Sequence, residues 1–91
     1  MATSIEVQRL KHGEYRVRVV EGRSETSHLV TLQSGDHQRL TGGNVQPEEL
    51  LKRSFEFLLE REPKESILAR FDLPVIARYF PEYEREMQRR L

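Results

Sequence analysis

The chain has 91 residues, of which 15 are Lys or Arg and 15 are Asp or Glu, so its formal net charge is zero. This length is too short for two ordinary domains, and no apolar run approaches the roughly 18 residues of a membrane-spanning helix. The chain contains no cysteine, which excludes disulfide scaffolds, thiol nucleophiles and zinc–thiolate sites.

Hydrophobic residues make up 36% of the chain and charged residues 33%. The supply of core-forming side chains is therefore thin, and small domains of this kind often gain stability by burying surface against a second copy or a partner. The N-terminal residues lack the apolar segment of a signal peptide. We therefore expect a cytoplasmic protein without membrane association, and a homo-oligomer (a dimer) or a complex with another protein.

Residues 4–10 and 14–20 alternate between apolar and polar side chains, as expected of β-strands with one buried face. A three-residue loop that ends at Gly13 places Val7 opposite Val17 and collects the apolar side chains on one face, whereas a two-residue loop mixes both faces. The sequence therefore predicts an antiparallel hairpin in the first register. Gly13 then takes the left-handed conformation of a bulged hairpin loop.

A third strand is predicted over residues 28–33, after a polar loop at 21–26. In this strand Val30 and Leu32 join the apolar face, and Leu29 points outward. Residues 1–33 are thus predicted to form a three-stranded antiparallel meander.

Residues 34–46 are predicted to be a glycine-rich connection, with one helical turn over 36–40. The strongest element follows at residues 47–62. Pro47 suits the first position of a helix, and the acidic residues after it suit the positive end of the helix dipole. Pro63 ends the helix. We predict one long central helix.

The apolar side chains of this helix cover an arc of about 200°, twice the width that an ordinary surface helix needs. One sheet face cannot cover this arc. The helix therefore needs a second apolar neighbour, either the C-terminal segment or another subunit. The residues of the arc are Leu50, Leu51, Phe55, Phe57, Leu58 and Leu59.

Residues 64–91 are predicted to be helical in two or three short pieces: 64–71, a second that begins at Pro74, and 82–91. Tyr79, Phe80 and Tyr83 form an aromatic cluster beside Pro81. These rings either close the small core or dock a partner, and the core preference of aromatic side chains favours the first interpretation. The whole chain is thus predicted to be one small α+β domain, residues 1–91.

No catalytic or metal-binding spacing is evident. The three histidines, His12, His28 and His37, lack any HxxxH or HExxH arrangement. No serine has the strand–turn–helix context of a nucleophile elbow, and the pair Glu60 and Glu62 is assigned to an exposed charged face. We therefore expect no enzymatic activity, no cofactor and no metal.

Residues 29–61 run through a strand, a polar turn, a possible helical turn, a break and an amphipathic helix. This order resembles the ribbon-helix-helix family of DNA-binding regulators and antitoxins, through LVTL at 29–32, RL at 39–40 and PEELLKRSFEFLLE at 47–60. The resemblance implies a dimer in which paired strands read DNA. Here the strand offers only Thr31 and Gln33 for base reading, and two strands precede it, so it would pair within its own chain.

Two functional hypotheses follow. The first is a small non-enzymatic module for protein–protein interaction or self-association. Its expected interface residues are Leu50, Phe57, Tyr79, Phe80 and Tyr83. The alternative is a nucleic-acid-binding transcriptional regulator, antitoxin-like in the sense of the ribbon-helix-helix resemblance. It would use basic residues of the sheet and its loop, namely Arg9, Arg16, Arg18 and Arg23. Acidic residues interleave with these arginines and reduce their field.

Overall fold

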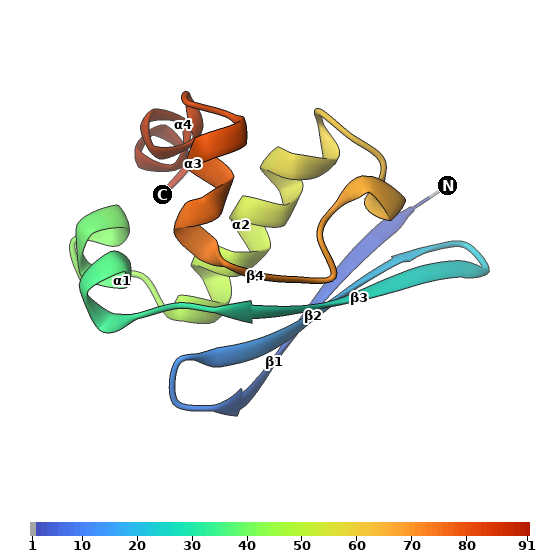
Figure 1. The fold of residues 1–91 in the computed structure, drawn as a ribbon, viewed down its shortest axis with the longest axis horizontal. Helices are drawn as coiled ribbons and strands as arrows, with labels where there is room; N and C mark the ends of the chain where they lie inside the picture. The colour runs from blue at the N-terminus through green and yellow to red at the C-terminus, as the bar shows by residue number, and fades with distance from the viewer. Residues whose placement is uncertain (1) are drawn as a thin grey trace.

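A computed structural model describes residues 2–91 and shows an α+β fold (Figure 1). The sheet has the strand order β1-β2-β3-β4. The helices cover one of its faces. In chain order the elements are β1 (Thr3–Lys11), β2 (Glu14–Glu21), β3 (Ser24–Thr31), α1 (Ser34–Thr41), α2 (Pro47–Leu59), the 3-10 turn η1 (Lys64–Ser66), β4 (Arg70–Asp72), the 3-10 turn η2 (Leu73–Val75), α3 (Ile76–Tyr79) and α4 (Tyr83–Arg90).

The first hairpin confirms the predicted register. Val7 lies opposite Val17, and Ile5 lies opposite Val19. Gly13 has a φ angle of 78°, and the backbone amide of Leu32 donates to its carbonyl oxygen at 2.9 Å. The alternation of apolar and charged residues thus fixes the pairing, because a slip by one residue would turn the apolar face to solvent.

The predicted boundaries of the third strand and of the loop before it were wrong. β3 begins at Ser24, after a tight turn in which Gly22 has a φ angle of 60°. Val30 and Leu32 are buried, as predicted, and so is His28. The Nδ1 of His28 donates to the carbonyl oxygen of Leu68 at 2.8 Å. Residues 21–26 are polar, and a polar sequence fits both a long loop and a strand end beside a tight turn. Composition alone therefore did not show that residues 24–26 belong to β3.

The predicted helix over residues 64–71 was also wrong, and the meander is not the complete sheet. This segment forms η1 and then β4, which pairs in parallel with β3. The amide of Leu29 donates to the carbonyl oxygen of Ala69 at 2.8 Å, and the Thr31 hydroxyl donates to the Asp72 carboxylate at 2.7 Å. Phe71 lies opposite Val30 on the covered face. The extended conformation of residues 70–72 therefore depends on pairing with β3, which is distant in the sequence. The local spacing of apolar residues does not reveal such a pairing.

The helices agree with the prediction in position more than in length. α1 has two turns where one was predicted, and α2 ends at Leu59, three residues before the predicted end. α2 lies between the sheet and the C-terminal elements (Figure 1). Within residues 2–91, no helix is both long and apolar enough to cross a membrane.

The wide apolar arc of α2 does have two neighbours, and both belong to the same chain. Phe55 packs toward the sheet, with ring centres 5.3 Å from His28 and 6.1 Å from Phe71. Phe57 packs toward the C-terminal segment, with ring centres 5.4 Å from Tyr83 and 5.9 Å from Phe80. The C-terminal segment is thus the second neighbour that the sequence requires, and of the arc only Leu59 keeps part of its surface exposed.

Two arginines close the junction between α2 and α4. The Arg61 guanidinium lies 3.6 Å from the centre of the Phe57 ring and donates to Glu82 at 3.1 Å. Arg90 donates to both carboxylate oxygens of Glu60, at 2.7 and 2.9 Å. The hydrogen bonds from Arg90 hold the pKa of Glu60 below its usual range. This polar network lies at the edge of the apolar contact between the two helices.

Candidate functional site

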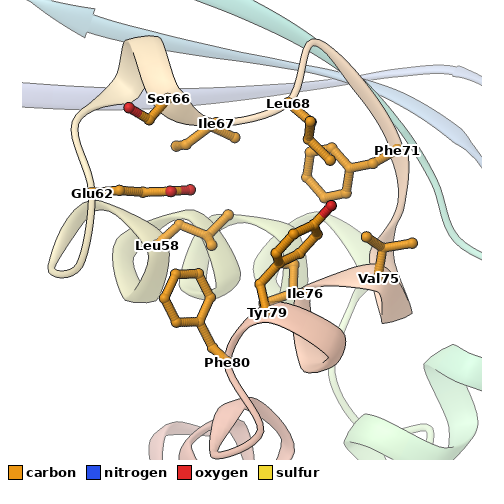
Figure 2. Close-up of a pocket in the computed structure, with 10 residues that line it drawn as sticks. All are labelled: Leu58, Glu62, Ser66, Ile67, Leu68, Phe71, Val75, Ile76, Tyr79 and Phe80. Atoms are coloured by element: carbon orange, nitrogen blue, oxygen red, sulfur yellow. The ribbon is translucent and has the colours of Figure 1, made fainter.

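An apolar hollow opens between the end of α2, the segment from η1 to β4, and α3 (Figure 2). We call it the apolar groove. Its volume is about 150 Å³, the size of a cavity that accepts a benzene ring. Four buried side chains contribute to its lining, namely Leu58, Ile67, Phe71 and Ile76. The groove is thus continuous with the hydrophobic core.

The remaining walls of the groove carry apolar side chains that reach solvent. Tyr79 is 65% exposed and Leu68 is 47% exposed. Val75 and Phe80 are partly exposed and line the same groove. In Figure 2 the Tyr79 ring stands beside Ile76, with its hydroxyl directed toward Phe71. Apolar side chains gathered on one hollow are a feature of binding surfaces, whereas scattered ones are ordinary.

Glu62 brings a carboxylate into these apolar surroundings. It follows the end of α2, and Figure 2 shows its carboxylate between Leu58 and Ile67. Desolvation raises the pKa of Glu62, and no charge or hydrogen bond from residues 2–91 opposes this shift. A cation placed in the groove would therefore stabilise a carboxylate that lacks an ion-pair partner among residues 2–91.

The structure divides the five predicted interface residues into two groups. Tyr79 and Phe80 line the apolar groove. Leu50, Phe57 and Tyr83 have no exposed surface and lie in the core. The buried Tyr83 hydroxyl lies 2.6 Å from the Ser54 hydroxyl, and burial raises its pKa.

The sequence assigned neither Glu62 nor Leu68 to a site, although both line the groove. Glu62 was assigned to an exposed charged face with Glu60, but it lies outside α2 and its carboxylate turns into the groove. Leu68 was placed in a short helix. An extended backbone at Ile67 instead leaves Leu68 exposed beside a buried neighbour. The local signal was Pro63, which lies four residues after the end of α2 and restricts the backbone of Glu62.

The four arginines of the nucleic-acid hypothesis do not share one surface. Arg16 and Arg18 lie on the uncovered face of the sheet, and Arg18 pairs there with Glu6 at 2.8 Å and Glu25 at 3.2 Å. Arg9 lies opposite the buried Tyr15, on the helix-covered face. Arg23 lies in the turn between β2 and β3.

The histidines have separate surroundings. His28 is in the core, where its Nε2 lies 2.8 Å from the Thr26 hydroxyl. His37 hydrogen-bonds to the carbonyl oxygen of Val45 and ties α1 to the start of α2. His12 lies in the turn between β1 and β2. In the part of the chain that the structure describes, no cluster of His, Asp and Glu is suited to hold a metal ion.

The topology differs from that of the ribbon-helix-helix family in the strand on which the resemblance depends. Residues 29–31 belong to β3, which is paired with β2 on one side and with β4 on the other. This strand has no free edge on which to form a ribbon with a second copy. Comparisons of the chain with models of protein families, with curated proteins and with solved structures found no match.

Proposed function

We propose that this chain is a small protein-interaction module that holds a segment of a partner protein in the apolar groove. The observation that supports the proposal is the exposure of Tyr79 and Leu68 on the rim of a hollow that leads into the core. Tyrosine is enriched among the residues that dominate binding energy at interfaces. Covering these side chains would remove apolar surface from water, which favours association.

The chemistry of the groove defines the segment that would fit. The apolar walls accept one large aliphatic or aromatic side chain, because the hollow is about 150 Å³ and a cavity of that size accepts a benzene ring. Glu62 would pair with a lysine or arginine beside that side chain, since its carboxylate has no ion-pair partner among residues 2–91. The proposed ligand is therefore a peptide segment that carries a large apolar residue next to a basic one.

A screen of displayed random peptides against the purified chain tests this proposal. We expect the selected peptides to share a large apolar residue with a neighbouring Lys or Arg. Their affinity should fall at least about tenfold in Tyr79→Ala and in Leu68→Asp, because truncating a central interface residue costs 1.4 kcal/mol or more.

The matched control is Leu10→Asp. Leu10 is exposed, at 37%, and lies in β1 at the other edge of the sheet from β4. This variant should bind the selected peptides as well as the unmodified chain does. Peptides that bind Tyr79→Ala and Leu68→Asp with unchanged affinity would show that the groove is not the binding site. The same conclusion would follow if the selected peptides had no apolar residue in common.

A further inference from the structure

β1 is an open edge of the sheet. It pairs with β2 on one side, and no strand within residues 2–91 pairs with its other side. It has nine residues, none of them proline or glycine, whereas β4 at the opposite edge has three. Its pairing is irregular only between Arg9 and Lys11, at the hairpin end. A long and regular row of unpaired backbone N–H and C=O groups is a template for another β-strand.

Apolar side chains behind this edge remain partly exposed. Ile5 and Val7 of β1 and Leu59 of α2 pack against the core but are not fully covered. One strand further in, Val17 and Val19 are completely buried. A strand added beside β1 would cover the remaining surface of Ile5 and Val7, as β2 and β3 do for each other's side chains.

An acidic hollow lies beside the same edge, between β1 and α2. It is lined by Glu21, Glu56 and Glu60, by Lys52, and by the apolar side chains of Ile5 and Leu59 together with Thr3. Glu21 already pairs with Lys64 and Glu56 with Arg53, and Glu60 pairs with both Arg90 and Arg61, but a carboxylate accepts several hydrogen bonds. The hollow therefore suits a further cationic group that arrives beside Ile5.

The sequence of β1 is complementary to itself in one antiparallel register. With Val7 opposite Val7 of a second copy, Arg9 lies opposite Ile5, and Glu6 lies opposite Gln8. Opposite residues share a face of the sheet, so the helices of both copies cover the same face. No like charges lie directly opposite each other. Arg9 has no ion-pair partner within residues 2–91 of its own copy, and this register brings it to the acidic hollow of the other.

We propose that two copies of this chain associate through β1 in this register, with Arg9 of each copy in the acidic hollow of the other. The product is one continuous sheet made of two four-stranded halves related by a twofold axis. A second copy of the chain is favoured as the partner of β1, because β1 itself supplies the apolar side chains, the basic side chain of Arg9 and the unpaired edge that the association needs. The apolar groove lies beside β4, at the other edge, and stays open.

Sedimentation equilibrium of the full chain is the first test. We expect a dimer, with a dissociation constant that rises about tenfold in Arg9→Glu, because two favourable charge pairs become repulsive. Adding Glu56→Lys to Arg9→Glu should restore most of the affinity, since the two charges are then exchanged. The control Arg23→Glu, in the turn after β2, and the groove variant Tyr79→Ala should leave the dimer unchanged. Circular dichroism verifies that each variant is folded.

Disulfide trapping is the second test and reports the register. The chain has no cysteine, so Val7→Cys introduces a single thiol that lies opposite itself, at a Cβ–Cβ separation of about 4.5–5.5 Å. This separation is close to that of a disulfide, so Val7→Cys should form covalent dimers readily. Leu10→Cys is more exposed but lies about 20 Å from its counterpart in this register, and it should not.

Three outcomes would overturn the proposal. The first is a monomer at every concentration up to about 1 mM, the range of the weakest specific complexes. The second is a dimer whose affinity is unchanged in Arg9→Glu. The third is a dimer that Leu10→Cys traps faster than Val7→Cys does. A dimer weakened by Tyr79→Ala instead of Arg9→Glu would place the association at the apolar groove.

Discussion

Replacing Phe57 by alanine tests how firmly the C-terminal segment completes the core. Phe57 is fully buried, and its ring packs edge-on against Tyr83 and Phe80. A buried Phe→Ala change costs about 3–5 kcal/mol. Loss of the contact with Arg61, at 3.6 Å from the ring centre, adds about 0.5–1 kcal/mol. Domains of 91 residues unfold with about 5–14 kcal/mol, so this one side chain carries a large share of the stability.

Urea unfolding followed by circular dichroism measures the change in the free energy of unfolding. Phe57→Leu keeps an apolar side chain and should cost less than Phe57→Ala, because it removes less buried volume. Leu10→Ala, at an exposed site, should change the stability by less than about 0.5 kcal/mol. If Phe57→Ala costs less than about 1 kcal/mol, then α4 is not packed on α2 as the structure shows, and the reasoning fails.

Three further predictions concern other parts of the fold. Tyr83→Phe removes the hydroxyl that contacts Ser54 at 2.6 Å and should lower the free energy of unfolding by about 1 kcal/mol; thermal unfolding checks this, and an unchanged midpoint would contradict it. Gly13→Ala forces a side chain onto a φ angle of 78° and should cost about 1–2 kcal/mol in the same urea assay; equal stability would show that the hairpin loop tolerates L-residues. The pKa of Glu60 is lowered by Arg90, and the ion pair contributes at most about 1 kcal/mol to the stability because it is exposed. This contribution is present above the unfolded-state pKa of Glu60 and is lost as the pH falls through the folded-state pKa. Glu60→Gln should therefore lower the stability at pH 7 and reduce the loss of stability in acid, and parallel pH profiles of the two proteins would refute this.

Much of the N-terminal half was predictable because its signals are local. In the hairpin of β1 and β2, only one register places all the apolar side chains on the same face of the sheet. Gly13 then allows the loop that this register needs. Pro47 and Pro63 bracket the central helix for an equally local reason, since each limits the backbone at its own position.

The C-terminal half was harder because its conformation depends on distant partners. Phe71 is spaced from Ile67 as on a helix, yet its segment is extended because it pairs with Val30 in β3. A three-residue strand is too short to show alternation. The wide arc of α2 predicted a second apolar neighbour correctly, but only the three-dimensional structure identifies it as the C-terminal segment.

The candidate site was predictable only in part. Tyr79 and Phe80 belong to an aromatic cluster that the sequence displays. That Tyr83 in the same cluster is buried while Tyr79 is exposed depends on where the single turn of α3 ends. The direction of the Glu62 carboxylate depends on a loop whose path no local pattern fixes.

The most direct measurement of the central claim is a double-mutant cycle between Glu62 and the basic residue of a selected peptide. The affinity of the peptide is compared with that of a version in which norleucine replaces the lysine, for the unmodified chain and for Glu62→Gln. The proposed groove predicts that the lysine peptide binds more tightly to the unmodified chain and that this advantage disappears in Glu62→Gln. An equal advantage for both proteins would contradict the claim, because the positive charge would then be recognised elsewhere.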